Sequence, residues 1–368
     1  MNVLLTCVGR RSYLVDYFRQ ALSGEGMVIG VDMDADTAGM ACVDKAYLVP
    51  RADSSDYIPA LLDICTREGV GLLVSLSDLD LGPLSRAIDA FGRIGVKTFV
   101  SDPDVIEVAN DKWACFEFLK RHHIPSPLTC LQLDEVQQYL RDGHLAFPLM
   151  VKPRWGMGSV SLFKVNDVEE LAFFYHHARN QVRDSFLNVI SQEDIDHSVI
   201  IQEWLEGDEF GIDVLHDFDG EHVATVVKQK LAMRAGETDR AITVENSRVA
   251  STAERVAACL RHRGNLDIDI MLDCDGVPRV LELNARFGGG YPFSHLAGVD
   301  FPRALIELAQ GRQPASYLLR ASIGVRGMKH IVPTVSSTPR CEKMLEALPQ
   351  MECTASMQIS STGSPRSV

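Results

Sequence analysis

The sequence predicts an α/β protein whose first hundred residues form a doubly wound parallel sheet. Short apolar runs typical of buried strands occur at residues 3–6, 28–31, 72–75 and 97–100. Amphipathic stretches of helical period, such as residues 57–68, lie between these runs. Because strands and helices alternate in this way, the expected arrangement is βαβα with the strands parallel.

The chain is long enough for more than one domain, and its texture changes after the first unit. Residues 1–102 form the predicted N-terminal domain, and a helix is expected from residue 103 through residue 120. Short strands and helices then mix, which indicates an α+β region at residues 103–330. We divide this region into a small lobe at about 125–202 and a C-terminal lobe at about 203–330. The Ser-, Thr- and Pro-rich tail at 331–368 is predicted to be partly mobile.

Two hairpins are expected in the C-terminal lobe. Residues 210–215 and 223–229 read as strands joined through a turn that contains Asp219-Gly220. Residues 267–273 and 280–283 form a second pair, joined through Asp275-Gly276.

Composition and charge exclude several classes of protein. The formal net charge is −14, which repels phosphate backbones and argues against nucleic acid as the main partner. No run of eighteen apolar residues suggests a membrane span, and the first residues lack the order of a secretory signal, so a cytoplasmic location is expected. The nine cysteines include no CxxC pair, so neither a disulfide framework nor a zinc site is expected. Four of them lie in apolar stretches and are predicted to be reduced packing residues: Cys7, Cys42, Cys65 and Cys115.

A cluster of oxygen ligands is predicted on the second hairpin. Glu282 and Asn284 are two residues apart on a strand, so both side chains point to the same face. The hairpin would bring Asp269, on the preceding strand, beside them. Oxygen ligands of this kind suit hard cations such as Mg²⁺. Arg286 and three glycines follow, and a guanidinium beside a metal suits a phosphoryl or acyl-phosphate group.

The segment LELNARFGGGYPF at residues 281–293 resembles the ATP-grasp superfamily, and so do three earlier segments in the expected order. These are NDKW at 110–113, VKPRWGMGS at 151–159 and VIIQEWLEGDEF at 199–210. The most similar subgroup is the ligases that resemble a single half of the carbamoyl-phosphate synthase large chain. The resemblance covers about residues 1–325. It implies a pre-ATP-grasp domain followed by an ATP-grasp fold of two α+β lobes.

The resemblance also implies a role for each site residue. Nucleotide binding falls to Lys112 and Lys152 at the phosphates, Gly156, Gly158 and Ser159 in a mobile lid loop, Glu203, Trp204 and Leu205 at the adenine, and Glu209 at the ribose. Asp269, Glu282 and Asn284 are the implied ligands of Mg²⁺, which Mn²⁺ could replace. Arg286 is the implied catalytic arginine, and Lys228, Arg234 and Arg240 are candidates for contacts to the substrate or the γ-phosphate.

The implied activity is ligation of a small carboxylic acid to a small amine, with ATP as the energy source and an acyl phosphate as the intermediate. Relatives are often dimers, so a homodimer is the expected assembly. At the end of the first strand, Arg10 or Arg11 could hold a substrate carboxylate, because doubly wound sheets bind ligands there. Asp78 or Asp80 could hold the amine. A solvated loop is the alternative for both pairs.

Two other functions stay open from the sequence. Asp32 ends the second strand as a ribose-binding acid of a dehydrogenase would, although the first turn has Gly9 without the GxGxxG pattern. A nucleotide-binding module with degenerate chemistry is the other alternative. The intact set of Asp269, Glu282 and Asn284 argues against that module, because a decayed site should lose its charged ligands first.

Overall fold

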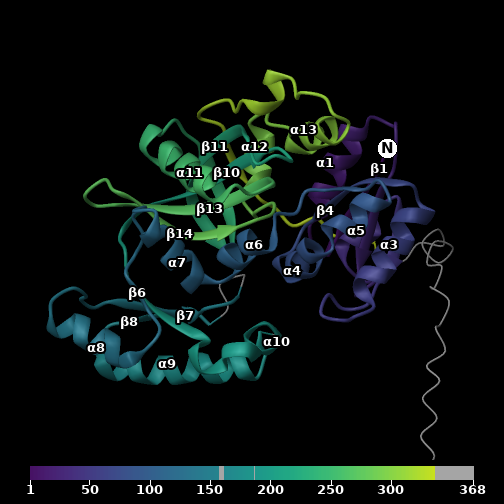
Figure 1. The fold of residues 1–368 in the computed structure, drawn as a ribbon. Helices are drawn as coiled ribbons and strands as arrows, with labels where there is room; N and C mark the ends of the chain where they lie inside the picture. Colours follow the sequence, from purple (N-terminus) through teal and green to yellow (C-terminus); the bar gives the residue numbers. More distant parts are fainter. Residues whose placement is uncertain (157–160, 186, 336–368) are drawn as a thin grey trace, which may run out of the picture.

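The computed structural model describes residues 1–156, 161–185 and 187–335 (Figure 1). Two residues of the predicted lid loop, Gly158 and Ser159, lie outside the described residues, as does most of the predicted tail. The described chain forms three sheets of five, four and six strands.

The first sheet is parallel, as predicted, and has the strand order β3-β2-β1-β4-β5. Strand β1 lies at the centre of this sheet, where both faces are covered. Its apolar residues Val3, Leu4 and Leu5 suit that position and are fully buried. The sequence prediction missed β3, a half-buried edge strand. The elements are β1 (Asn2–Thr6), α1 (Ser12–Leu22), β2 (Val28–Asp32), α2 (Ala38–Cys42), β3 (Lys45–Leu48), α3 (Tyr57–Arg67), β4 (Val70–Ser75), α4 (Asp78–Arg86), α5 (Ile88–Arg93) and β5 (Lys97–Thr98).

The single helix expected at residues 103–120 is wrong, because the chain forms two helices that meet at Asp111. The Asp111 carboxylate accepts a hydrogen bond from the Trp113 backbone N–H, which caps the second helix. Asp111 itself has an extended conformation (φ −103°, ψ 109°), so the first helix ends there. The two helices are α6 (Pro103–Asn110) and α7 (Lys112–Arg121), and Lys112 is the first residue of the second one.

The second sheet is antiparallel, with the order β6-β9-β7-β8, and helices α8 and α9 pack on it (Figure 1). A cluster around Leu149, Val151 and Ile201 forms its core. The elements are β6 (Thr129–Cys130), α8 (Leu133–Arg141), β7 (Leu149–Pro153), β8 (Phe163–Val165), α9 (Val168–Arg183), α10 (Asn188–Ser191), the 3₁₀ helix η1 (Gln192–His197) and β9 (Val199–Glu203).

The third sheet has the order β14-β13-β10-β11-β12-β15 and contains both predicted hairpins. Its strands are antiparallel, and helix α11 packs against its centre. The elements are β10 (Gly207–His216), β11 (His222–Arg234), β12 (Glu237–Thr243), α11 (Ser247–Leu260), β13 (Gly264–Asp273), β14 (Pro278–Asn284), α12 (Tyr291–Leu296), α13 (Phe301–Ala309), the 3₁₀ helix η2 (Ser316–Leu319) and β15 (Arg326–Met328).

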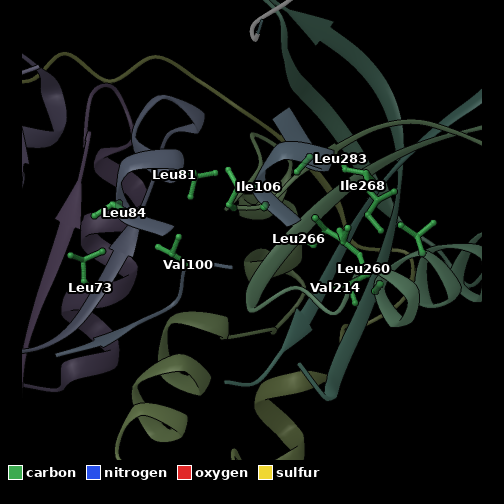
Figure 2. Close-up of a cluster of buried hydrophobic side chains, with 14 of the residues drawn as sticks. Leu73, Leu81, Leu84, Val100, Ile106, Val214, Leu260, Leu266, Ile268 and Leu283 are labelled. Carbon is green, nitrogen blue, oxygen red and sulfur yellow. The ribbon is translucent and has the colours of Figure 1, made fainter. Parts of the chain in front are cut away.

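One continuous apolar core joins the first sheet to the third. Figure 2 shows Leu81 and Val100 on the N-terminal side, Ile106 of α6 in the middle, and Leu266 and Leu283 on the strands of the third sheet. Helix α13 also packs against α1 in a second cluster. The first and third sheets are therefore fixed against each other. Among the described residues, no helix is long and apolar enough to cross a membrane.

Two histidines are buried where β10 ends and β13 begins. The rings of His216 and His262 stack with centroids 4.0 Å apart, and the two residues are 2% and 0% exposed. Burial lowers the pKa of His216 to about 4 and that of His262 well below its usual range. The charge of His222 lowers the pKa of His216 further, and that of His216 lowers the pKa of His262. Both rings are therefore neutral near pH 7.

These histidines should make the fold sensitive to acid. Because the folded pKa of His216 is below the ordinary value of 6.5, the unfolded chain binds more protons once the pH falls below 6.5. Their stabilising effect is complete above pH 6.5 and is lost as the pH falls toward 4. When the pH is lowered from 7 to 5, the free energy of unfolding should fall in both proteins. The fall should be about 2 kcal/mol smaller in a His216→Gln variant than in the wild type, because the variant has no histidine to protonate at this position. Urea denaturation at each pH measures this difference.

His144→Gln, at an exposed position, is the matched control and should follow the wild type. If the slopes of stability against pH are the same for wild type and His216→Gln, the assignment of acid sensitivity to His216 is wrong.

Candidate active site

Two adjoining cavities lie on the same face of the third sheet. The larger one, about 720 Å³, extends between this sheet and the second sheet. The smaller one, about 250 Å³, extends toward the first sheet, where Gly9 and Ser77 line it. Lys230, Asp269 and Glu282 line both cavities and therefore mark their junction.

Strand register explains why the carboxylates gather at this junction. Asp269 pairs with Glu282 and Asp267 pairs with Asn284 across β13 and β14. Side chains two residues apart share a face, so all four point the same way. Leu283, between Glu282 and Asn284, points to the opposite side and is buried in the core.

Asp267 was not among the predicted site residues. It lines the smaller cavity and is 8% exposed, and burial and the nearby Asp213 raise its pKa. A Cβ atom on Gly288 would lie 2.0 Å from its Oδ2 atom, so the glycine-rich segment can pass this carboxylate only without a side chain. The alternation Asp267, Asp269 on one strand was a signal for it in the sequence.

Lys230 is a second residue that the sequence prediction missed. Its Nζ atom lies 2.6 Å from Asp269 Oδ1 and 2.7 Å from Glu209 Oε1. Burial opposes its charge, but Asp269 and Glu209 outweigh burial and raise the pKa of the ammonium. Gly211 leaves room for this side chain, because a Cβ there would lie 3.2 Å from Lys230 Cε. Lys230 thus joins the predicted metal ligand Asp269 to the predicted ribose ligand Glu209.

The two predicted phosphate-binding lysines line the larger cavity. Lys112 Nζ donates to the carbonyl of Gly156 at 2.8 Å and lies 3.9 Å from Glu282 Oε2. Lys152 is the next-to-last residue of strand β7 and is 7% exposed, and burial lowers its pKa to about 8 even though Glu282 favours its charge. Within the described part of the chain, the Lys152 ammonium has no hydrogen bond or ion pair, so it is free to meet a ligand.

The predicted adenine segment forms another wall of the larger cavity. Glu203, Trp204, Leu205 and Glu209 all line it. The Glu203 carboxylate accepts a hydrogen bond from the Leu128 backbone N–H at 3.1 Å, so that side chain is held on the protein. Apolar residues that the sequence prediction did not single out complete the walls: Met150, Leu162, Met271 and Leu281. A cavity of this size with an apolar part and a cationic end can hold a nucleotide.

Arg286 lines the smaller cavity and connects it to the first sheet. Its guanidinium donates to Asp78 Oδ2 at 2.6 and 3.0 Å and to Asn284 Oδ1 at 3.0 Å. Burial disfavours the charge of this guanidinium, but Asp78 outweighs burial and raises its pKa. Asp78, which was one candidate for holding the amine, is thus the partner of Arg286.

The structure does not bring every predicted residue to the junction. Lys228 is 1% exposed and donates to Asp213 and, at 3.0 Å, to Ser294 Oγ, so its charge is neutralised inside the protein. Arg240 is exposed and lines neither cavity. Irregular pairing between β11 and β12, near residues 230–233, shifts the alternation of side chains on these strands.

Two acidic residues of the first sheet are also committed elsewhere. Asp80 is fully buried and accepts hydrogen bonds from Tyr57 at 2.8 Å and Ser75 at 2.6 Å, so it cannot hold an amine. Asp32, at the end of β2, accepts a hydrogen bond from the Gly9 backbone N–H at 2.9 Å. It thereby stabilises the turn that follows β1. This contact argues against the dehydrogenase alternative.

The donor set fits a hard cation that also binds phosphate oxygens. The described residues hold no cluster of three His, Cys, Asp or Glu side chains that could bind a metal alone. Asp269 and Glu282 supply two carboxylates, and Asn284 adds an amide oxygen. Burial and the neighbouring carboxylates raise the pKa of Asp269 to about 7, although Lys230 opposes them, and a bound cation would relieve this repulsion. Few protein oxygens, completed by phosphate and water, are typical of Mg²⁺ sites.

Two family models match this chain, one over the first sheet and the other over most of the second and third sheets. Residues 3–99 match the model described as the PylC-like N-terminal domain, and residues 109–290 match the model described as the ATP-grasp domain. The predicted resemblance to the ATP-grasp superfamily and the predicted fold class are therefore confirmed.

Individual relatives are more distant. A phosphoribosylamine–glycine ligase of Escherichia coli O6:H1 is 27% identical over 254 residues, which cover 63% of this chain and 56% of that protein. A carbamoyl phosphate synthase large chain of Thermoanaerobacter sp. is 22% identical over 230 residues, which cover 60% of this chain and 20% of that protein. The chain thus matches about half the length of the first relative and a fifth of the second.

A solved structure shares the fold. The biotin carboxylase domain dimer of the 2-oxoglutarate carboxylase of Hydrogenobacter thermophilus, in complex with MgADP, ADP and bicarbonate, has a TM-score of 0.67 at 16% identity. The match covers 85% of this chain and 70% of that chain.

The ion pair between Asp78 and Arg286 should carry much of the stability of this junction. Both side chains are nearly buried, at 13% and 8% exposure, so Asp78→Asn leaves a buried guanidinium without its counter-ion. We expect a loss of about 3 kcal/mol or more in the free energy of unfolding, measured by urea denaturation.

Asp102→Asn is the matched control, because it breaks a more exposed pair with Arg263 that also connects the N-terminal part to the third sheet. This variant should lose less than about 1 kcal/mol. Equal losses in the two variants would contradict the special weight given to the pair of Asp78 and Arg286.

Proposed function

We propose that this chain, whose residues 109–290 are an ATP-grasp domain, is a Mg²⁺–ATP-dependent ligase that joins a small carboxylic acid to an amine. The observation that supports this most is the position of the carboxylates. Asp269 and Glu282 lie between a nucleotide-sized cavity lined by Lys112 and Lys152 and a smaller cavity lined by arginines. A phosphoryl group passing from ATP to an acid would cross this junction.

The proposed reaction has two balanced steps. A carboxylate oxygen attacks the γ-phosphorus of ATP, the bond to the bridging oxygen breaks, and ADP leaves with that electron pair. The amine then attacks the acyl carbon, phosphate leaves, and the amine loses a proton as the C–N bond forms. The relative named phosphoribosylamine–glycine ligase joins an amine to an acid by its name, and this likeness supports the class of reaction.

The residues of the chain would act mainly by position and charge, because phosphoryl transfer needs little covalent help. Lys112 and Lys152 would neutralise the phosphates, and Arg286 would stabilise the acyl phosphate. Asp269, Glu282 and Asn284 would hold Mg²⁺, which supplies charge neutralisation and orientation of the phosphates when bound. Lys230, which contacts both Asp269 and Glu209, would hold the carboxylate at the metal and the carboxylate at the ribose at a fixed distance from each other.

The remaining alternative is a module that binds nucleotide without chemistry. ADP release separates the two, because only a ligase consumes ATP when an acid is present. Hydroxylamine can replace an unknown amine in this assay, since it traps acyl phosphates as hydroxamates. ADP release that depends on an acid, with formation of the hydroxamate, supports the ligase, and silence with every acid and amine supports the module. Location in the cytoplasm and assembly as a homodimer stay predictions.

Replacement of Glu282 tests the metal assignment. Glu282→Gln keeps the size of the side chain but removes its charge, so ADP release should fall at least about 100-fold while the thermal unfolding temperature stays within a few degrees. Glu169→Gln, at an exposed position on α9, is the control and should keep full activity. Turnover of Glu282→Gln at the wild-type rate would sink the assignment.

Replacement of Lys152 tests the nucleotide assignment. Lys152→Met removes a buried charge from the larger cavity, and ATP affinity measured by calorimetry should fall roughly 10- to 100-fold. Lys120→Met, on the exposed side of α7, removes the same charge at 69% exposure and should bind ATP like the wild type. Unchanged ATP affinity in Lys152→Met would refute the role of this lysine.

A further inference from the structure

The cations around the junction fall into two groups on opposite sides of the carboxylates. Lys112 and Lys152 line the larger cavity and not the smaller one, and Arg11 and Arg286 line the smaller cavity and not the larger one. Lys230 lines both cavities. The arginines are therefore separated from the nucleotide-sized space by the proposed metal ligands. A ligand that meets both arginines lies in the smaller cavity.

The two guanidiniums converge on one backbone oxygen. Arg11 Nη1 donates to the carbonyl of Phe287 at 2.7 Å, and Arg286 Nη1 donates to the same oxygen at 3.2 Å. One carbonyl cannot neutralise two positive charges, and Asp78 pairs with Arg286. Arg11 is thus the guanidinium of this corner that has no acidic side chain within ion-pair distance among the described residues, although Asp78 and Glu237 attract its charge from farther away.

The other cations of the smaller cavity do not share this property. Lys228 pairs with Asp213, and Lys230 pairs with Glu209 and Asp269. Among the described cations that line this cavity, only Arg10 and Arg11 have no acidic side chain within ion-pair distance, and Arg10 is exposed to solvent. The acidic Glu237 on the opposite wall is paired with Lys329 at 2.9 Å.

The position of Arg11 makes an anion favourable there. Arg11 lines the cavity and is partly exposed there. Burial lowers the pKa of its guanidinium, and the positive charge of Arg286 lowers it further. A carboxylate beside two guanidiniums would relieve both effects and could accept hydrogen bonds from each.

The volume of the cavity limits the size of the ligand. At about 250 Å³ it is smaller than typical sites for drug-sized ligands, which occupy about 300–1,000 Å³. A compact acid therefore fits this cavity better than a long one.

We propose that Arg11 and Arg286 together hold the carboxylate that reacts with ATP, and that this acid is a compact molecule of amino-acid size. The proposal rests on the ligase function above and names its acid-binding residue and substrate class. Arg11 comes from the turn after β1, so the N-terminal domain selects the acid while the ATP-grasp domain holds the nucleotide.

The test uses the full chain, ATP, hydroxylamine and a fixed panel of acids. The panel contains the twenty common amino acids, the dicarboxylates from oxalate to adipate, and tripeptides of glycine and alanine. ADP release by the wild type identifies the best acid, and its KM is then compared in Arg11→Gln, Arg11→Lys and Arg93→Gln. Thermal denaturation shows that each variant is folded.

Arg11→Gln should raise the KM of the acid at least 10-fold and leave the Kd of ATP within twofold, because its charge faces only the smaller cavity. Arg11→Lys should recover part of this loss, which a merely structural role in the turn would not explain. Arg93→Gln removes the same charge from an exposed arginine of the same domain that lines neither cavity, and it should change the KM less than threefold.

Three results would overturn the proposal. An equal effect of Arg93→Gln would show that only the net charge of the protein matters. Weaker ATP binding in Arg11→Gln would show a phosphate contact, and tripeptides used as well as single amino acids would refute the size limit. If no acid drives ADP release, the proposed ligase function is refuted, but the proposed acid-binding site is not yet tested. Calorimetric binding of the same acids in the presence of ADP then decides, since no binding, or binding unchanged in Arg11→Gln, refutes the arginine site.

Discussion

The repulsion among carboxylates on one face of the third sheet is the constraint on which the rest of the site depends. Asp267, Asp269 and Glu282 point the same way because strand register and the period of two leave no other arrangement. Two unit charges about 4 Å apart repel by about 4 kcal/mol at an effective dielectric constant of 20. Such a face is stable only with cations near it, and Lys230 and Lys112 supply them from two other elements.

The N-terminal domain is part of this balance. The core that runs from Leu81 through Ile106 to Leu283 fixes the first sheet against the third (Figure 2). On that rigid base, Asp78 reaches Arg286 across the junction. The small cavity therefore has walls from two domains, and its shape depends on an interface that is packed like a core.

Much of the fold and part of the site follow from local rules in the sequence. Strands of the first sheet are predictable because their apolar runs are buried on both faces, whereas β3 was missed because it is short and half buried. Glu282 and Asn284 follow from the period of two, and Asp269 follows from its hairpin. Asp111 is a residue type that commonly caps helices, so the break there could have been predicted, but the sequence prediction placed one continuous helix across it.

Residues that depend on pairing between distant strands were harder to predict. Lys230 matters because β11 lies beside β10, which puts it next to Glu209, and no local pattern gives that pairing. Arg240 was expected at the site, but the irregular pairing of β11 with β12 moves it to the surface. Asp78 and Asp80 lie on the same first turn of α4, and only the packing around Tyr57 shows which one is buried in the core.

The contact of Arg154 with Asp111 has a consequence for motion. Arg154 donates to both oxygens of Asp111 at 2.8 and 2.7 Å, and its backbone carbonyl accepts from the Lys112 N–H at 3.2 Å. The start of α7 is thus clamped to the end of β7, which carries Lys152. Helix α7 itself packs, through Cys115, Phe118 and Leu119, in the core that contains strands of the third sheet. The clamp therefore ties the end of β7 to that core at one point. A swing of the second sheet would turn about this point, so Lys152 would stay near Lys112 while the more distant parts of the second sheet move away.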